Sequence, residues 1–176
     1  MATSPGTAEM LYSRNFDAQV EIAAAPEVIF ARLDEQALLG AHMEKPSLMT
    51  MGMRMHFELD SQQGRAVGSV IGLSGKMLGI ALHVDEIVTE RDPPRRKVWE
   101  TRGRPRLLVI DAYRMGFEIA PAAHRTTLRV FIDYALPPSG VGKLLGIVFG
   151  AVYARWCVQR MLDDAARHFA PTARDR

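Results

Sequence analysis

Residues 137–169 read PPSGVGKLLGIVFGAVYARWCVQRMLDDAARHF, and this segment decides the fold. Pro137, Pro138 and Gly140 end the preceding element, because neither residue type suits the interior of a helix or strand. From Val141 to Phe169 the chain has no proline, which predicts one helix of about 29 residues. At 1.5 Å per residue this helix is about 43 Å long. It can therefore cross an entire sheet.

The chain before this helix alternates apolar and polar side chains, as strands with one buried face do. The alternation is clearest in residues 15–22 (NFDAQVEI) and in residues 53–60 (MRMHFELD). Further strands are predicted at Val67–Met77, Leu78–Arg91, Lys97–Thr101, Leu107–Ile119 and Thr126–Leu136, with turns at residues 62–64, 92–94, 103–105 and 121–124. Pro26 and Glu27 favour a helix start after the first strand, and an interrupted apolar stripe continues to about Met43.

The element order is therefore one strand, short helices, about six strands and one long helix. Strands joined by short turns pair antiparallel, and the apolar face of a single sheet must be covered. Only the helices can cover it. The sequence predicts an α+β domain whose curved, roughly seven-stranded sheet surrounds the C-terminal helix. A space between sheet and helix is the candidate binding site.

The bulk composition fits one soluble globular domain. The 176 residues are 48% hydrophobic and 24% charged, with a net charge of +2. We expect a flexible N-terminus at residues 1–13, a single domain at 14–170 and a tail at 171–176. With one cysteine, Cys157, no internal disulfide forms, and a reducing, cytoplasmic location is expected. The longest apolar run, residues 144–154, is shorter than the roughly 20 residues of a spanning helix.

Three motifs resemble the START-like, or SRPBCC, helix-grip superfamily, in its polyketide cyclase/dehydrase and lipid-transport branch. They are residues 25–30 (APEVIF), residues 88–94 (VTERDPP) followed by 98–100 (VWE), and residues 134–137 (YALP) before the helix at 144–156. The resemblance covers about residues 14–170 and implies a helix-grip fold. Ala25 departs from the Asp or Ser that often caps the first helix in this superfamily. Because the superfamily includes lipid carriers, cyclases, hormone receptors and chaperone activators, the resemblance leaves the activity open.

The alternation and the helical spacing together predict which side chains face the interior. Either they are packed core, or a subset of them lines a ligand cavity. The predicted ligand-binding set is Met53, Met55, Phe57, Leu82, Val84, Val109, Asp111, Tyr113, Met115, Leu128, Val130, Tyr134, Leu145, Phe149, Val152 and Trp156.

Two acids share the phase of apolar neighbours and are the candidate polar groups of the interior. Asp111 is in phase with Val109 and Tyr113, and Glu86 is in phase with Val84. A buried carboxyl needs hydrogen-bond donors or a raised pKa. If catalysis occurs, the candidate acid–base residues are Asp111, Glu86, Tyr113 and Tyr134. Alternatively, a bulge shifts the phase and Asp111 points to solvent, and Glu86 has a similar ambiguity.

Other partners and cofactors are constrained more weakly. The five histidines lack metal-ligand spacing, and no nucleophile elbow, phosphate loop or dinucleotide fingerprint occurs, so neither a metal nor a cofactor is expected. Cys157 is expected to be a buried structural thiol. The basic run at residues 91–106 is read as solvated turns or as a site of transient contact with an anionic membrane. Trp99 is the only aromatic residue in that run, so nucleic acid is not expected. Nothing in the sequence sets an oligomeric state.

Three functions remain open at this point. The first hypothesis is binding or transport of a small hydrophobic molecule, lipid-like or polycyclic. The second is a cyclase or dehydratase that moves protons at a ligand in the same cavity. The third is a protein-interaction or stress module that uses the outer face of the sheet; a solidly packed interior would favour it.

Overall fold

The computed structural model describes residues 12–35, 55–77 and 80–170. Seven strands and two helices lie in these ranges. Their bounds are β1 Arg14–Ile22, α2 Pro26–Asp34, β2 Met55–Leu59, β3 Val70–Met77, β4 Ile80–Asp92, β5 Arg96–Arg106, β6 Tyr113–Pro121, β7 Thr126–Tyr134 and α5 Gly140–His168.

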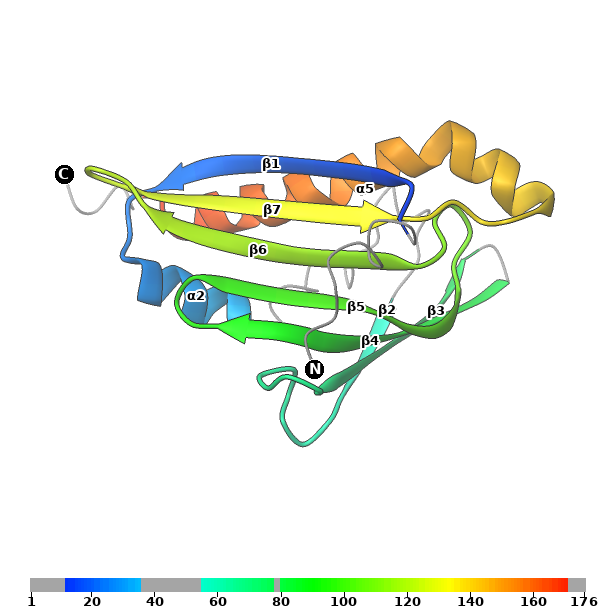
Figure 1. Cartoon of the computed structure of the whole chain (residues 1–176), viewed down its shortest axis with the longest axis horizontal. Helices are drawn as coiled ribbons and strands as arrows, with labels where there is room; N and C mark the ends of the chain where they lie inside the picture. Colours follow the sequence, from blue (N-terminus) through cyan, green and yellow to red (C-terminus); the bar gives the residue numbers. More distant parts are fainter. Residues whose placement is uncertain (1–11, 36–54, 78–79, 171–176) are drawn as a thin grey trace.

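The strands form one antiparallel sheet in the order β1-β7-β6-β5-β4-β3-β2 (Figure 1). From β2 to β7 each strand pairs with the next along the chain, whereas β1 pairs with β7 across more than 100 residues. The first strand is thereby placed beside the last strand, at one edge of the sheet.

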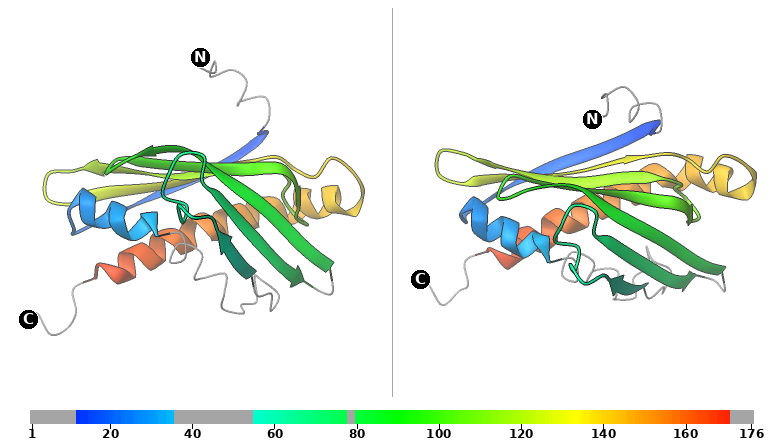
Figure 2. Two further views of the ribbon diagram at one scale, coloured as in Figure 1. Left: turned by 90° about the horizontal axis from the view of Figure 1, so that it is seen from below. Right: turned by 60° about the horizontal axis from the view of Figure 1, so that its bottom comes forward.

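Both helices lie on the same face of the sheet, and the sheet curves around them (Figure 2). α5 makes most of its contacts with β1 and β7, and α2 packs on β6. The buried side chains of α5 come mainly from its second half, among them Cys157, Val158, Met161 and Leu162. The predicted helix-grip architecture is confirmed.

The start of each helix follows from its local sequence. Pro26 opens α2, and no side chain caps the helix at Ala25, as the missing Asp or Ser predicted. Three glycines spaced by four residues lie in the first turns of α5. A β-carbon at Gly146 would lie 2.9 Å from the Val109 carbonyl oxygen and 2.9 Å from Cδ of Pro137. The glycines therefore let the helix backbone approach the chain segment that precedes β6.

α5 is also the one helix in the described ranges that is long and apolar enough, by length and composition, to cross a membrane. The uninterrupted run at 144–154 had predicted no such helix. The difference arises because the helix extends past Lys143 and Arg155, the charges that bounded that run, and remains largely apolar at Trp156, Cys157 and Val158. Its second half packs into the core of the domain.

The structure corrects two predicted boundaries. The turn predicted at residues 103–105 does not end β5, which continues to Arg106 and accommodates Gly103 at a positive φ of 74°. The strand predicted to begin at Leu107 begins instead at Tyr113. Residues 107–112 form the connection, in which the Asp111 amide donates a hydrogen bond to the Ala135 carbonyl at 2.9 Å.

Candidate functional site

The inward face of the sheet is set by the strand register. Pairing of Glu86 with Thr101, Trp99 with Met115, and Tyr113 with Tyr134 places every second residue of neighbouring strands on the same side. Several predicted interior residues are buried on this side, namely Leu82, Val84, Tyr113, Met115, Leu128, Val130 and Tyr134. The alternation therefore predicted the orientation of β4, β6 and β7 correctly.

Glu86 is the acid of this face. Its side chain comes from the middle of β4, between the inward side chains of Val84 and Val88, and the residue is only 4% exposed. The Tyr113 hydroxyl donates a hydrogen bond to Glu86 Oε1, and the Trp99 side chain provides a second hydrogen bond. Burial raises the pKa of Glu86 to about 7, although both hydrogen bonds and the charge of Lys97 oppose the shift. Near pH 7, the neutral and the ionised forms of the Glu86 carboxyl are therefore both populated.

α5 brings two further titratable groups to the same place. Tyr153 and Cys157 are one helical turn apart, share a hydrogen bond, and interact electrostatically with Glu86. The pKa of Tyr153 is raised well above its usual value, first by Cys157 and then by burial. Burial raises the pKa of Cys157 to about 12. At neutral pH both groups keep their protons, so Cys157 is the buried structural thiol that the sequence suggested.

We call Glu86, Tyr113, Trp99, Tyr153 and Cys157 the interior polar cluster. It joins β4, β5, β6 and α5 through groups that are far apart in sequence. Sequence reasoning found Glu86 and Tyr113 but missed the other three as site residues. Trp99 lies on a predicted strand, but its in-phase neighbours Lys97 and Thr101 are polar, so the strand phase gave no signal that Trp99 faces inward. The meeting of Tyr153 and Cys157 with Glu86 has no local signal.

Asp111 does not join this cluster. It lies in the connection before β6, is half-buried, and is therefore outside the strand alternation from which its inward orientation was predicted. The strand phase on which that expectation rested does not extend to Asp111, because β5 ends at Arg106 and β6 begins at Tyr113. Of the four candidate catalytic residues, Glu86 and Tyr113 are in contact; Tyr134 is buried beside Tyr113 on β7.

The prediction for α5 holds for only part of the helix. Leu145 and Trp156 are half-buried, but Phe149 is 51% exposed and Val152 is 53% exposed. The predicted inward orientation of Phe149 and Val152 is wrong. The cause is the close approach at Gly146 and Gly150, which turns the glycine side of the helix to the sheet and the bulky side chains away from it. Phe57 and Val109 are half-buried against the core, Met53 lies outside the described residues, and Met55 is described only as backbone.

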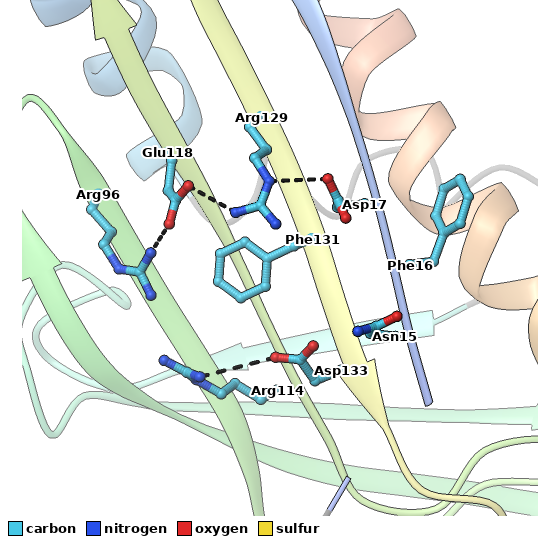
Figure 3. Close-up of a pocket in the computed structure, with 9 residues that line it drawn as sticks. All are labelled: Asn15, Phe16, Asp17, Arg96, Arg114, Glu118, Arg129, Phe131 and Asp133. Atoms are coloured by element: carbon cyan, nitrogen blue, oxygen red, sulfur yellow. Dashed lines mark hydrogen bonds and ion pairs between the residues drawn. The ribbon is translucent and has the colours of Figure 1, made fainter. Parts of the chain in front are cut away.

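The outer face of the sheet carries a separate hollow of about 190 Å³ (Figure 3). Around it, Glu118 accepts hydrogen bonds from Arg96 and Arg129, and Arg129 also pairs with Asp17 at 3.0 Å. The guanidinium groups of Arg96, Arg114 and Arg129 all lie within 6 Å of the Phe131 ring centre. These charges neutralise one another, so the hollow is built as a structural ion-pair network.

Gly116 is what allows the Phe131 ring to lie over β6. A β-carbon at this position would lie 2.6 Å from the Lys97 carbonyl oxygen and 2.7 Å from Cζ of Phe131. Because the carbonyl is fixed in the sheet, we expect Gly116→Ala to lower the free energy of unfolding by about 1–3 kcal/mol, measured by urea denaturation. Gly72→Ala is the matched control, since its β-carbon would meet nothing closer than 3.4 Å. Equal effects of the two substitutions would contradict this explanation.

A further hollow of about 600 Å³ lies beside α2, lined by residues that include Phe30, Asp34, Arg65 and Arg91. Two ion pairs lie here, between Arg91 and Asp34 at 2.7 Å and between Arg65 and Glu35 at 3.4 Å. Within the described ranges, no group of three His, Cys, Asp or Glu residues could hold a metal ion. The interior polar cluster is therefore the candidate functional site.

The family model for polyketide cyclase/dehydrase and lipid transport proteins matches residues 13–174. The chain belongs to this family. The resemblance seen in residues 25–30, 88–100 and 134–156 is thereby confirmed. Comparison with curated protein sequences gives no match.

Solved structures support the same fold at low sequence identity. A truncated norcoclaurine synthase from Thalictrum flavum superposes with a TM-score of 0.61 at 13% identity, covering 90% of this chain and 94% of that one. A protein from Thermus thermophilus gives 0.61 at 13% identity over 90% and 100% of the two chains. The major latex-like protein 151 of Panax ginseng gives 0.51 at 15% identity over 90% and 98%. At these identities the likeness establishes the fold of this family member and no more.

Proposed function

We propose that this protein binds a small hydrophobic ligand, lipid-like or polycyclic, between the inward face of the sheet and α5. The observation that carries the proposal is Glu86, a fully buried acid on an apolar face that is bonded to Tyr113 and divided between two protonation states near pH 7. Such a group can donate a hydrogen bond to a ligand oxygen or accept one from it. Ligand sites are typically apolar surfaces with a few such polar groups.

Accessible apolar surface around the cluster supports the same proposal. Phe57, Leu59, Val109, Tyr153 and Trp156 all pack against the core but are only half-buried. α5 approaches β1 and β7 most closely, whereas Glu86 is on β4. A hydrophobic molecule that contacts these side chains would bury apolar area that is otherwise exposed. This burial would stabilise the complex by about 25 cal/mol per Å² of apolar surface.

Ligand binding can be followed with the chain's two tryptophans, Trp99 and Trp156, because both lie on the inward side. We expect purified protein to carry a hydrophobic compound detectable by native mass spectrometry. We also expect a fatty acid, a quinone or an aromatic polyketide to change the tryptophan emission saturably. Tyr113→Phe should weaken the affinity for a ligand with a polar head about tenfold, because one hydrogen bond to that head or to Glu86 is lost.

Tyr12→Phe is the matched control for this experiment. It removes a tyrosine hydroxyl that interacts with Glu100, outside the interior polar cluster, and should leave the affinity unchanged. Empty protein in native mass spectrometry, together with no emission change across the panel, would overturn the proposal. Equal losses of affinity in the two variants would show that Tyr113 does not contact the ligand.

A second candidate function is acid–base catalysis on a bound polyketone, as in a cyclase or dehydratase. The specific observation in its favour is again Glu86, whose pKa of about 7 suits a group that gives and takes protons at neutral pH. One protein with this fold, the norcoclaurine synthase, is an enzyme by its name. Glu86→Gln keeps the shape and hydrogen-bonding capacity of the side chain but cannot transfer a proton. If the protein is catalytic, turnover is lost in this variant while ligand affinity persists. If the wild-type protein shows no turnover, ligand binding is the only one of these two functions that remains.

A further inference from the structure

The exposed side of α5 changes character halfway along the helix. Of the eight large hydrophobic side chains that are exposed in the described ranges, six lie between residues 141 and 152. We call these six the α5 apolar patch: Val141, Leu144, Ile147, Val148, Phe149 and Val152. Beyond it, the exposed residues of the helix include Arg155, Gln159, Asp163 and Arg167. The second half thus has the polar solvent face of an ordinary surface helix, and the first half does not.

The patch is large and continuous. It covers about three turns, or about 17 Å of helix at 1.5 Å per residue. Each of its side chains is at least 51% exposed. The glycines on the opposite side fix this orientation, because Gly146 and Gly150 hold the helix against the Val109 carbonyl. The apolar side chains therefore cannot turn inward without separating the helix from the sheet.

The charged side chains on the helix segment that carries the patch are all cations. Between residues 134 and 162 the chain contains Lys143, Arg155 and Arg160 and no Asp or Glu; Arg160, beyond the patch, pairs with Asp164 at 3.7 Å, which leaves Lys143 and Arg155 as the cations that flank the patch. Arg106 is exposed at the start of the connection whose Leu108 carbonyl faces Gly142, which places another cation at this end of the molecule. An apolar helix face with cationic flanks has the character of helices that lie in the interface of an anionic membrane.

We propose that the α5 apolar patch docks the protein on an anionic lipid surface, with the helix lying in the interface and the sheet held above it. The observations favour this occupant over a second copy of the chain. Two patches packed together would bring their lysines and arginines close without any acid on the patch to compensate. An anionic lipid surface supplies the missing negative charge.

Most of the basic run at residues 91–106, which the sequence suggested for membrane contact, is less suited to it; Arg106, the exposed cation near α5, is the last residue of this run. Arg91 and Lys97 pair with Asp34, Arg95 pairs with Asp92, and Arg96 pairs with Glu90 and Glu118. These cations are already neutralised within the domain. The inference therefore depends on α5 and is independent of the interior ligand.

Vesicle flotation of the full chain tests the proposal. The probes are phosphatidylcholine vesicles with and without phosphatidylglycerol. We expect binding to the anionic vesicles that weakens with added salt and is much poorer without phosphatidylglycerol. Val152→Glu should weaken the binding at least tenfold, because it removes an inserted apolar side chain and places a carboxylate against an anionic surface. Gln159→Glu, seven residues further along the helix, makes the same change in net charge outside the patch and should alter binding less than threefold.

Each other outcome overturns the proposal. Failure to float with anionic vesicles, or equal losses in Val152→Glu and Gln159→Glu, would remove the role of the patch. Equal binding to vesicles of both compositions would show that the negative charge of the lipid does not contribute to docking. Sedimentation that shows a wild-type dimer, converted to monomer by Val152→Glu, would assign the patch to a second copy of the chain. Circular dichroism and thermal unfolding of both variants establish that they fold.

Discussion

Asp34→Ala is expected to lower the free energy of unfolding by about 3–5 kcal/mol, the usual cost of leaving one partner of a buried ion pair without the other. Lys97 has a fully buried side chain, and its Nζ lies 2.9 Å from Oδ1 of Asp34. Arg91 donates to the other carboxylate oxygen at 2.7 Å. Burial opposes the ionisation of Asp34, but the hydrogen bonds and charges of Arg91 and Lys97 outweigh it and lower the pKa of the carboxyl.

The pH dependence of this loss distinguishes it from a simple packing defect. Burial already lowers the pKa of Lys97, and Asp34 is the group that opposes the shift. Without Asp34 the pKa falls further, so the unfolded chain binds more protons than the native variant does, and stability rises with pH. We therefore expect the deficit of Asp34→Ala, measured by urea denaturation, to shrink between neutral and alkaline pH.

Two comparisons complete this experiment. Adding Lys97→Met to Asp34→Ala removes the buried ammonium and should recover part of the lost stability. Glu35→Ala breaks the ion pair with Arg65, whose side chain is 46% exposed, and should cost far less. A pH-independent deficit, or no recovery in the double variant, would show that the ion pair is not the cause.

The sequence predicted most of the fold because its patterns are local. Pro137 and Pro138 delimit the long helix, whose predicted range of 141–169 differs by one residue from the observed Gly140–His168. The alternation on β4, β6 and β7 is regular, so it predicted the burial of Glu86 and Tyr113. Where the strand phase ended, the pattern no longer applied, as at Asp111 in the connection before β6.

The remaining errors have physical causes that lie outside local pattern. In α5 the apolar residues surround the helix, so spacing alone could not select the buried side, and Phe149 and Val152 were assigned wrongly. The buried side of the helix is determined by Gly146 and Gly150, which lie against the carbonyl of Val109 in the connection before β6. The interior polar cluster is equally non-local, since Tyr153 of α5 meets Glu86 of β4 only through the pairing of the whole sheet.

The second large prediction follows from the buried acid Glu86 and concerns how the free energy of unfolding depends on pH. Below its ordinary pKa of 4.5, Glu86 is protonated in both the native and the unfolded chain. Between pH 4.5 and about 7 the unfolded chain has released this proton while the native protein still holds it. The native state then binds more protons, so the free energy of unfolding falls as pH rises. Over this window Glu86 should cost about 3 kcal/mol in total, and above pH 7 the loss is complete.

Glu86→Gln isolates this contribution, because glutamine accepts the Tyr113 hydrogen bond but does not titrate. The difference in unfolding free energy between the variant and the wild type should grow in favour of the variant from pH 4.5 to about 7 and then stay constant, since all other groups titrate alike in both proteins. Urea denaturation at a series of pH values measures it. Glu21→Gln, at an exposed position on β1, is the control for the exchange of Glu for Gln itself. A difference for Glu86→Gln that does not change with pH would mean that the carboxyl ionises in the folded protein as readily as in water. The interior would then have no neutral acid to offer a hydrophobic ligand.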